Sequence, residues 1–176
     1  MKAKNVIVAV LMLGMALVSC DKQGQSKMTV RMTDAPGDFE HVFVDVQEVQ
    51  VHYSGGGNPG AWVSLQTNAG IYDLLTLQNG ITTVLAPNTV IPSGKITQIR
   101  LILNTQNSVV VDGLTFPLQT SSATQTGLKI NLNTVLDPGE DYEVLLDFDA
   151  EKSIVLEGNG SYSLKPTIKV LSIVQL

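Results

Sequence analysis

Apolar and polar residues alternate with a period of two along most of this chain. Met28, Val30 and Met32 alternate with polar residues in the first predicted strand, which ends at Thr33. A half-buried strand has this pattern because successive side chains point to opposite faces of a sheet. No long stretch shows the 3.6-residue period of an amphipathic helix. The pattern therefore predicts an all-β domain.

The second predicted strand runs from His41 to Tyr53 and changes phase part of the way along. Its apolar residues form two sets that are out of step, namely Val42, Val44 and Val46, then Val49, Val51 and Tyr53. Because a shift of one residue moves side chains to the other face, we expect a β-bulge near Gln47 and Glu48. Such a bend would let one long strand pass between two packed sheets.

Turn residues divide the rest of the chain into short strands. Asp112-Gly113 predicts a type I′ hairpin, in which both central residues take positive φ. D-P-G-E, beginning at Asp137, predicts a type II turn that joins strands 129–136 and 142–148. Pro166 lies near the start of the last predicted strand, 162–174, and favours an edge or a bulge there.

The strand count and the apolar composition together predict the architecture. Lys95–Leu103 is the most continuous apolar strand and suits a central position, whereas Tyr72–Leu77 fits either a short strand or a helical turn. Seven to nine short strands separated by turns favour an antiparallel β-sandwich. Since aromatic residues make up 5% of the chain, we expect an aliphatic core.

The amino terminus has the pattern of a secretory signal peptide. Two lysines precede the apolar run Val6–Val18. This run is too short for a membrane-spanning helix, which needs about 20 residues. We expect a signal peptide at residues 1–19 and no transmembrane segment in the mature chain.

The lone cysteine directly follows this segment. L-V-S-C, from Leu17 to Cys20, resembles the lipobox of bacterial lipoproteins. The resemblance implies cleavage before Cys20, a diacylglycerol on its sulfur, and an acyl chain such as palmitate on the new amino terminus. Two or more chains anchor a protein durably to a membrane. The alternative is a free, buried cysteine in an uncleaved cytosolic protein.

The remaining chain fits a lipidated tether at residues 20–26 and one domain at residues 27–176. Without the signal, nine basic residues face sixteen acidic ones, a net charge of −7. An acidic domain without a basic patch is a poor candidate for binding nucleic acid. Since no second cysteine is present, the domain must fold without a disulfide.

Several stretches resemble a family of bacterial lipoproteins with a domain of unknown function. They are T-D-A-P-G-D-F-E-H-V-F-V-D-V from Thr33, I-P-S-G-K-I-T-Q-I-R-L from Ile91, the Asp112 hairpin, G-L-K-I-N from Gly127, L-D-F-D-A-E-K-S-I-V from Leu146 and G-S-Y-S-L-K-P-T-I-K-V from Gly160. The resemblance implies an immunoglobulin- or prealbumin-like sandwich at the cell envelope. It implies no established activity and therefore no catalytic residue.

Five aspartates are weak candidates for a calcium site. They are Asp34, Asp38, Asp45, Asp147 and Asp149. Calcium takes six to eight oxygen ligands, but the spacing matches no known calcium loop. Asp34 fits a turn former that binds the following amides equally well. Asp147 and Asp149 also fit the solvated face of a strand, so we expect no metal cofactor.

Other ionisable groups do not assemble into a recognised catalytic motif. His41 and His52 are the only histidines, and zinc needs three or four nitrogen or sulfur ligands. We interpret both as solvent-facing strand residues. Glu140, Asp141 and Glu143 could mimic paired glycosidase carboxylates, but acids beside a surface turn are common.

The only tryptophan, Trp62, follows the glycine-rich loop Ser54–Gly60. An exposed indole there would offer a stacking platform for a sugar, whereas a sandwich with few aromatic residues more often buries its tryptophan. Trp62 is thus a weak candidate for ligand binding.

These features predict a non-enzymatic, lipid-anchored binding module of the bacterial envelope, on the outer membrane or cell surface rather than the inner membrane. Its partner would be a glycan, a peptide or a protein, bound through turns such as Asp34–Asp38 and Ser54–Gly60. The alternatives are an assembly subunit of a surface fibre, which would complete a sheet by strand donation, and an envelope hydrolase, which would need a pocket with convergent ionisable groups.

Overall fold

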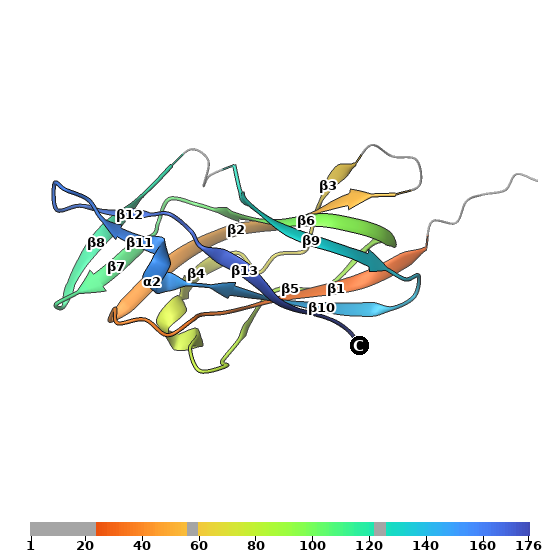
Figure 1. Cartoon of the computed structure of the whole chain (residues 1–176), viewed down its shortest axis with the longest axis horizontal. Helices are drawn as coiled ribbons and strands as arrows, with labels where there is room; N and C mark the ends of the chain where they lie inside the picture. The colour runs from red at the N-terminus through yellow and green to blue at the C-terminus, as the bar shows by residue number, and fades with distance from the viewer. Residues whose placement is uncertain (1–23, 56–59, 122–125) are drawn as a thin grey trace, which may run out of the picture.

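The protein folds into two stacked β-sheets, described here by a computed structural model for residues 24–55, 60–121 and 126–176. The all-β sandwich is confirmed, with four strands in the smaller sheet and nine in the larger (Figure 1). In chain order the elements are β1 (Gln25–Thr33), β2 (His41–Ser54), β3 (Ala61–Ser64), β4 (Gly70–Asp73), the 3₁₀ turn η1 (Leu74–Leu77), β5 (Thr83–Pro92), β6 (Gly94–Leu103), β7 (Ser108–Val111), β8 (Leu114–Thr120), β9 (Leu128–Leu136), β10 (Asp141–Phe148), the one-turn helix α2 (Ala150–Ser153), β11 (Ile154–Leu156), β12 (Tyr162–Leu164) and β13 (Ile168–Gln175).

The smaller sheet has the order β13-β10-β1-β5. All its pairs are antiparallel except β1 with β10. β1 begins at Gln25, so the last two residues of the predicted tether 20–26 belong to the folded domain. The physical reason is the buried Ser26 hydroxyl, which lies 2.7 Å from the Ser93 hydroxyl and donates to the Asp137 carbonyl at 2.8 Å.

The larger sheet is built on both sides of β2. β7 and β6 follow one another along one side of β2, while β4 and β3 follow one another along the other. β9 borders β6, and β8 borders β7. β12 and β11 continue the sheet beyond β8. Because these flanking strands are interrupted, the described chain has thirteen strands rather than the expected seven to nine.

The predicted bulge in β2 is confirmed by a register shift between Val46 and Glu48. The predicted passage of this strand between the sheets is wrong, since β2 pairs only with strands of the larger sheet. The bulge instead lies where the neighbours of β2 change. The extra residue keeps the valines of both halves on the core face.

The predicted turns have the expected backbone geometry, but some of them join strands in different sheets. Asp112 and Gly113 take φ values of 52° and 72°, as the hairpin requires. Gly139 also has a positive φ, but its turn links β9 in the larger sheet to β10 in the smaller one, not two paired strands. Pro166 lies in a second crossing between the sheets, and this crossing divides the predicted strand 162–174 into β12 and β13. Proline cannot donate to a ladder, so pairing ends around it.

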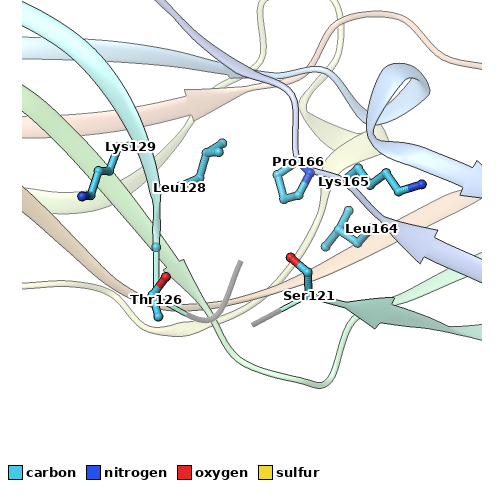
Figure 2. A pocket seen from close by; sticks show the side chains of 8 residues that line it. Ser121, Thr126, Leu128, Lys129, Leu164, Lys165 and Pro166 are labelled. Atoms are coloured by element: carbon cyan, nitrogen blue, oxygen red, sulfur yellow. The ribbon is translucent and has the colours of Figure 1, made fainter. Parts of the chain in front are cut away.

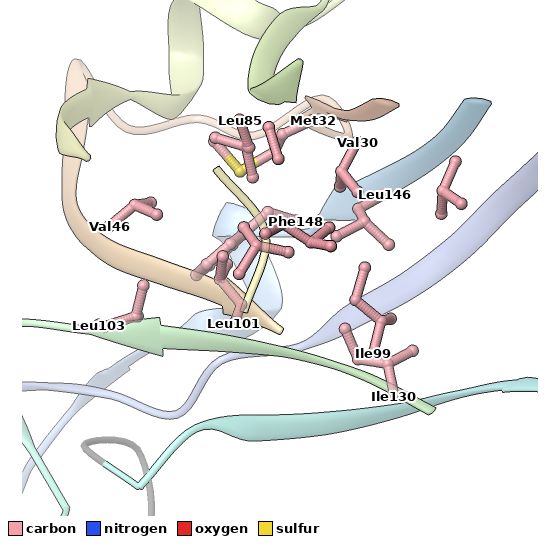
Figure 3. Close-up of a cluster of buried hydrophobic side chains, with 14 of the residues drawn as sticks. Val30, Met32, Val46, Leu85, Ile99, Leu101, Leu103, Ile130, Leu146 and Phe148 are labelled. Carbon is pink, nitrogen blue, oxygen red and sulfur yellow. The ribbon is translucent and has the colours of Figure 1, made fainter. Parts of the chain in front are cut away.

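The core between the sheets is aliphatic, as expected. Figure 3 shows Phe148 among Val30, Met32 and Leu146 of the smaller sheet and Leu101 of the larger. Each of these side chains is at most 1% exposed. This packed interior makes both sheets rigid supports for the side chains on their outer faces.

Candidate functional site

The outer face of the larger sheet carries two cross-strand rows of polar and aromatic side chains. One row is Ser64, Gln50, Arg100 and Lys129, and the other is Trp62, His52, Gln98 and Asn131. Each row takes one residue from β3, β2, β6 and β9 in turn. Neighbouring strands lie about 4.8 Å apart, so a row spans about 14 Å. We call these eight residues the Trp62 face.

Trp62 lies at the centre of the interactions on this face. The Arg100 guanidinium carbon is 4.2 Å from the centroid of the indole ring, and the Lys129 ammonium nitrogen is 5.9 Å from it. The His52 ring meets the indole edge-on, with 5.1 Å between centroids. Trp62 is half-buried and outside the core, so the usual burial of a lone tryptophan does not apply here. Its two cation–π contacts are favourable where they are partly desolvated.

Hydrogen bonds fix the first row of the Trp62 face. Arg100 Nε–H donates to Gln50 Oε1 at 2.7 Å, and Gln50 Nε2 donates to Ser64 Oγ at 3.2 Å. Glu48 lies beside this row. Hydrogen bonds from Gln50 and Ser64, and then the charge of Arg100, hold the pKa of Glu48 below its usual value. The carboxylate therefore stays ionised at neutral pH.

The second row is held in a similar way. Gln98 Nε2 donates to Asn131 Oδ1 at 3.3 Å. His52 Nδ1 lies 2.7 Å from the Thr97 hydroxyl. His41, at the other end of β2, instead lies 2.6 Å from Asp73 Oδ2. The two histidines are thus in separate surroundings, and His52 is half-buried rather than openly solvent-facing.

Asp34 is the most perturbed of the predicted acidic residues. Its side chain is 4% exposed and accepts a 2.9 Å hydrogen bond from the backbone N–H of Ala150. The expectation that Asp34 binds the amides that follow it is wrong, because Ala150 lies on α2, far away in the sequence. Burial raises the pKa of Asp34 to about 6, and the nearby charges of Asp147 and Asp149 add to the increase.

Asp147 and Asp149 are buried and are not the solvated face of a strand. Asp147 lies 2.9 Å from the Lys169 ammonium group. Asp149 caps α2 by accepting from the Lys152 backbone N–H at 3.0 Å, and it also pairs with the Lys152 ammonium group. Burial alone would raise the pKa of Asp149, but the hydrogen bonds and charge of Lys152 hold it below its usual value.

The other two acidic candidates lie in different surroundings. Asp38 is exposed in the turn after β1. Asp45 is buried in β2, where its N–H donates to Asn107 Oδ1 at 2.8 Å and its carbonyl accepts from Asn104 at the same distance. Within residues 24–55, 60–121 and 126–176, no group of three or more histidine, aspartate or glutamate side chains is placed to hold a metal ion.

The acids near the 137–140 turn form ion pairs rather than a facing pair. Asp141 lies 3.6 Å from the Lys27 ammonium group, and Glu143 lies 4.0 Å from the Arg31 guanidinium group. They project from β10 toward β1 in the smaller sheet. This arrangement does not resemble two carboxylates on either side of a glycosidic bond.

Of two further cavities, one borders the Trp62 face at Lys129 and the other is lined by residues outside that face. The larger, about 440 Å³, lies between the start of β9 and the end of β12. Figure 2 shows Leu128 directed toward Leu164 and Pro166, whereas Lys129 points away. The smaller, about 350 Å³, is lined by Asp34, Asp147 and neighbouring loop residues. Both acids already have protein partners among the described residues.

Cys20 and the predicted signal peptide lie outside the described residues, so their lipidation remains a prediction. Among the residues that are described, no helix is long and apolar enough to cross a membrane.

Sequence reasoning selected Trp62 but missed its cationic neighbours. Arg100 and Lys129 occupy outward positions in strands whose alternation is clear from the sequence. Only the register of β6 with β2 and β9 shows that both lie beside the indole.

Comparisons with known proteins identify a family but no characterised relative. Two crystal structures, each of a "putative cell adhesion protein", resemble the chain weakly. The first, from Bacteroides ovatus, is 11% identical, with a TM-score of 0.29 over 86% of this chain and 45% of that one. The second, from Bacteroides eggerthii, is 10% identical, with a TM-score of 0.30 over 83% of this chain and 56% of that one. The chain thus spans about half the length of each, and no curated protein matches its sequence. Residues 25–166 match the model of the "Domain of unknown function (DUF4382)" family, and the chain belongs to that family.

Proposed function

We propose that this protein is a lipid-anchored, non-enzymatic module of a bacterial cell envelope, which binds a glycan on the Trp62 face. The lipobox-like stretch that ends at Cys20 supports the anchor, which would hold the sandwich at the outer membrane or cell surface. The observation that carries the binding role is the position of the half-buried indole among hydrogen-bonding side chains on a rigid sheet.

The chemistry of this face matches a sugar better than an apolar peptide. A sugar ring has an apolar C–H surface bordered by hydroxyl groups that both donate and accept hydrogen bonds. Trp62 supplies an apolar surface with a polar edge. Gln50, Gln98 and Asn131 carry side-chain amides, each with two donors and one acceptor carbonyl. The hydrogen bond from Gln50 to Ser64 and the one from Gln98 to Asn131 keep these groups in place before a ligand arrives.

Two alternatives have less support. A fibre subunit that receives a donated strand needs a vacant place in its own sheet. Here the final strand, β13, pairs with β10 along its length. A hydrolase needs free ionisable groups that converge on a cavity, whereas the buried acids described above are held in ion pairs and a backbone hydrogen bond.

A glycan array tests the binding role. We expect the full chain, purified in a non-ionic detergent, to retain a subset of glycans, and Trp62→Ala to weaken that binding about tenfold or more. Trp62→Phe should restore part of the loss. Leu156→Ala is the matched control, because Leu156 is 62% exposed on β11 at the far side of the same sheet. Equal binding by wild type and Trp62→Ala, or no retained glycan, would contradict the proposal.

The anchor is tested separately by Cys20→Ser in the native host. We expect the wild-type chain to sediment with membranes and to carry a lipid mass on its amino-terminal peptide. The variant should lack that mass. An unmodified peptide in mature wild-type protein would refute lipidation.

A further inference from the structure

We infer that the glycan is acidic, a polysaccharide bearing carboxylate or sulfate groups, and that Arg100 and Lys129 bind these groups. This inference rests on the proposed function, because it uses the Trp62 face. It specifies the charge of the glycan and identifies Arg100 and Lys129 as the two side chains that select for this charge.

The distribution of ion pairs distinguishes this face from the rest of the described chain. Eight lysine and arginine side chains lie in residues 24–55, 60–121 and 126–176. Five of them pair with an acid: Lys27, Arg31, Lys152, Lys165 and Lys169. Within those residues, Lys95, Arg100 and Lys129 have no carboxylate within 4.0 Å, and all three are on β6 or β9. In the described part of the chain, the cations without a carboxylate within this distance thus lie on two neighbouring strands.

The register places two of these cations directly opposite each other. Arg100 on β6 is the cross-strand partner of Lys129 on β9. Like charges at such positions repel each other and destabilise a sheet. The contacts with the Trp62 ring and the charge of Glu48 offset part of this repulsion. An anionic group between the two cations would remove the remainder, which is the electrostatic complementarity that an acidic ligand offers.

Arg100 is also oriented for such a ligand. Its Nε–H is engaged by Gln50, and the guanidinium plane is held over the indole ring. An arginine fixed in this way binds a carboxylate or sulfate with less loss of side-chain entropy than a free one. The amides of Gln98 and Asn131 lie in the neighbouring row, where they can bind hydroxyl groups of the same sugar chain. Polyglutamate would satisfy the cations, but it has no ring with an apolar C–H surface to stack on the indole.

The test compares charged polysaccharides with a neutral one. We expect the full chain in non-ionic detergent to bind dextran sulfate and polygalacturonate in calorimetric titration, and to bind neutral dextran at least tenfold more weakly. The double variant Arg100→Gln/Lys129→Gln should lose about tenfold or more in affinity for dextran sulfate, since it removes both charged hydrogen-bond donors. Lys152→Gln/Lys165→Gln removes the same charge from ion-paired positions and should bind like wild type. Binding by wild type should also weaken as salt is raised from about 0.05 to 0.5 M.

A second measurement separates folding from binding. Dextran sulfate should raise the melting temperature of wild type but not that of Arg100→Gln/Lys129→Gln, whose own melting temperature should be at least as high as that of the wild type. Equal losses in both double variants would overturn the inference, as would binding of polyglutamate as tight as that of dextran sulfate. Trp62-dependent binding of neutral glycans alone would refute the acidic ligand while leaving the proposed function intact. Absence of all glycan binding would refute both.

Discussion

Asp34 should make the stability of this domain depend on pH between about 4 and 6. Its carboxyl group is 4% exposed and lies near the buried Asp147 and Asp149. Among the described residues, Ala150 N–H donates a hydrogen bond to it at 2.9 Å, whereas Gln78 Nε2 is 3.5 Å away. The folded protein therefore stabilises the charged form of Asp34 less well than water does.

The sign and size of the effect follow from the pKa of Asp34, which rises from 3.8 in the reference state to about 6 in the folded protein. Well below pH 3.8 both states hold the proton, and the stabilisation of the protonated form is fully present. The folded state binds this proton more tightly than the unfolded state does. As the pH rises through 6 the folded state loses the proton, and this stabilisation is lost. Two pKa units correspond to about 3 kcal/mol.

Asp34→Asn isolates this contribution. We expect its free energy of unfolding, minus that of wild type, to become more positive by about 2.5 kcal/mol between pH 4 and pH 7. Urea titrations at half-unit pH steps, followed by tryptophan fluorescence, measure the difference. Asp38→Asn, in the exposed part of the same turn, is the control for removing a carboxylate from this turn. A flat difference for Asp34→Asn would refute the reasoning that burial weakens the acidity of Asp34.

Two further predictions concern the core and the turns. Phe148→Ala should lower the free energy of unfolding by about 3–5 kcal/mol in urea titrations, because the ring is fully buried between the sheets; a loss below about 1 kcal/mol would contradict this packing. Gly94→Ala should destabilise more than Gly139→Ala by about 1 kcal/mol or more. Both glycines have positive φ, but a Cβ at Gly94 would lie 3.1 Å from the Tyr53 ring, whereas a Cβ at Gly139 meets nothing within 4 Å. Equal melting temperatures for the two variants would show that the contact with Tyr53 is unimportant.

Local features of the fold could be read from the sequence because local chemistry determines them. The phase change near Gln47 predicts the bulge in β2, and Asp112-Gly113 predicts positive φ at both residues. Which of the two sheets a strand joins depends on contacts between distant segments. The alternation of apolar and polar residues does not encode these contacts. The turn at Gly139 therefore has the expected geometry but joins different sheets, and Pro166 marks a crossing between sheets rather than a bulge.

The same limit applies to the candidate site. Trp62 stands out because it is the only tryptophan, and a resemblance to a family without known activity adds no binding residue. Its exposure depends on the pairing of β3 with β2, which brings the indole beside His52 and within reach of Arg100. The five acidic candidates form two groups far apart in the sequence. The fold brings Asp34 near Asp147 and Asp149, but it places Asp45 against Asn107.

The bulge in β2 connects the sequence pattern to the proposed site. Val46 faces the core before the bulge, and Val49 and Val51 face it afterwards. In a regular strand the alternation that begins before the bulge would continue, so Gln50 and His52 would point inward. The extra residue at the bulge instead returns these two side chains to the outer surface, in line with Ser64 and Trp62 on β3. One local irregularity thus allows the first half of β2 to pack in the core while its second half supports a polar binding face, whose groups are fixed by the sheet before any ligand arrives.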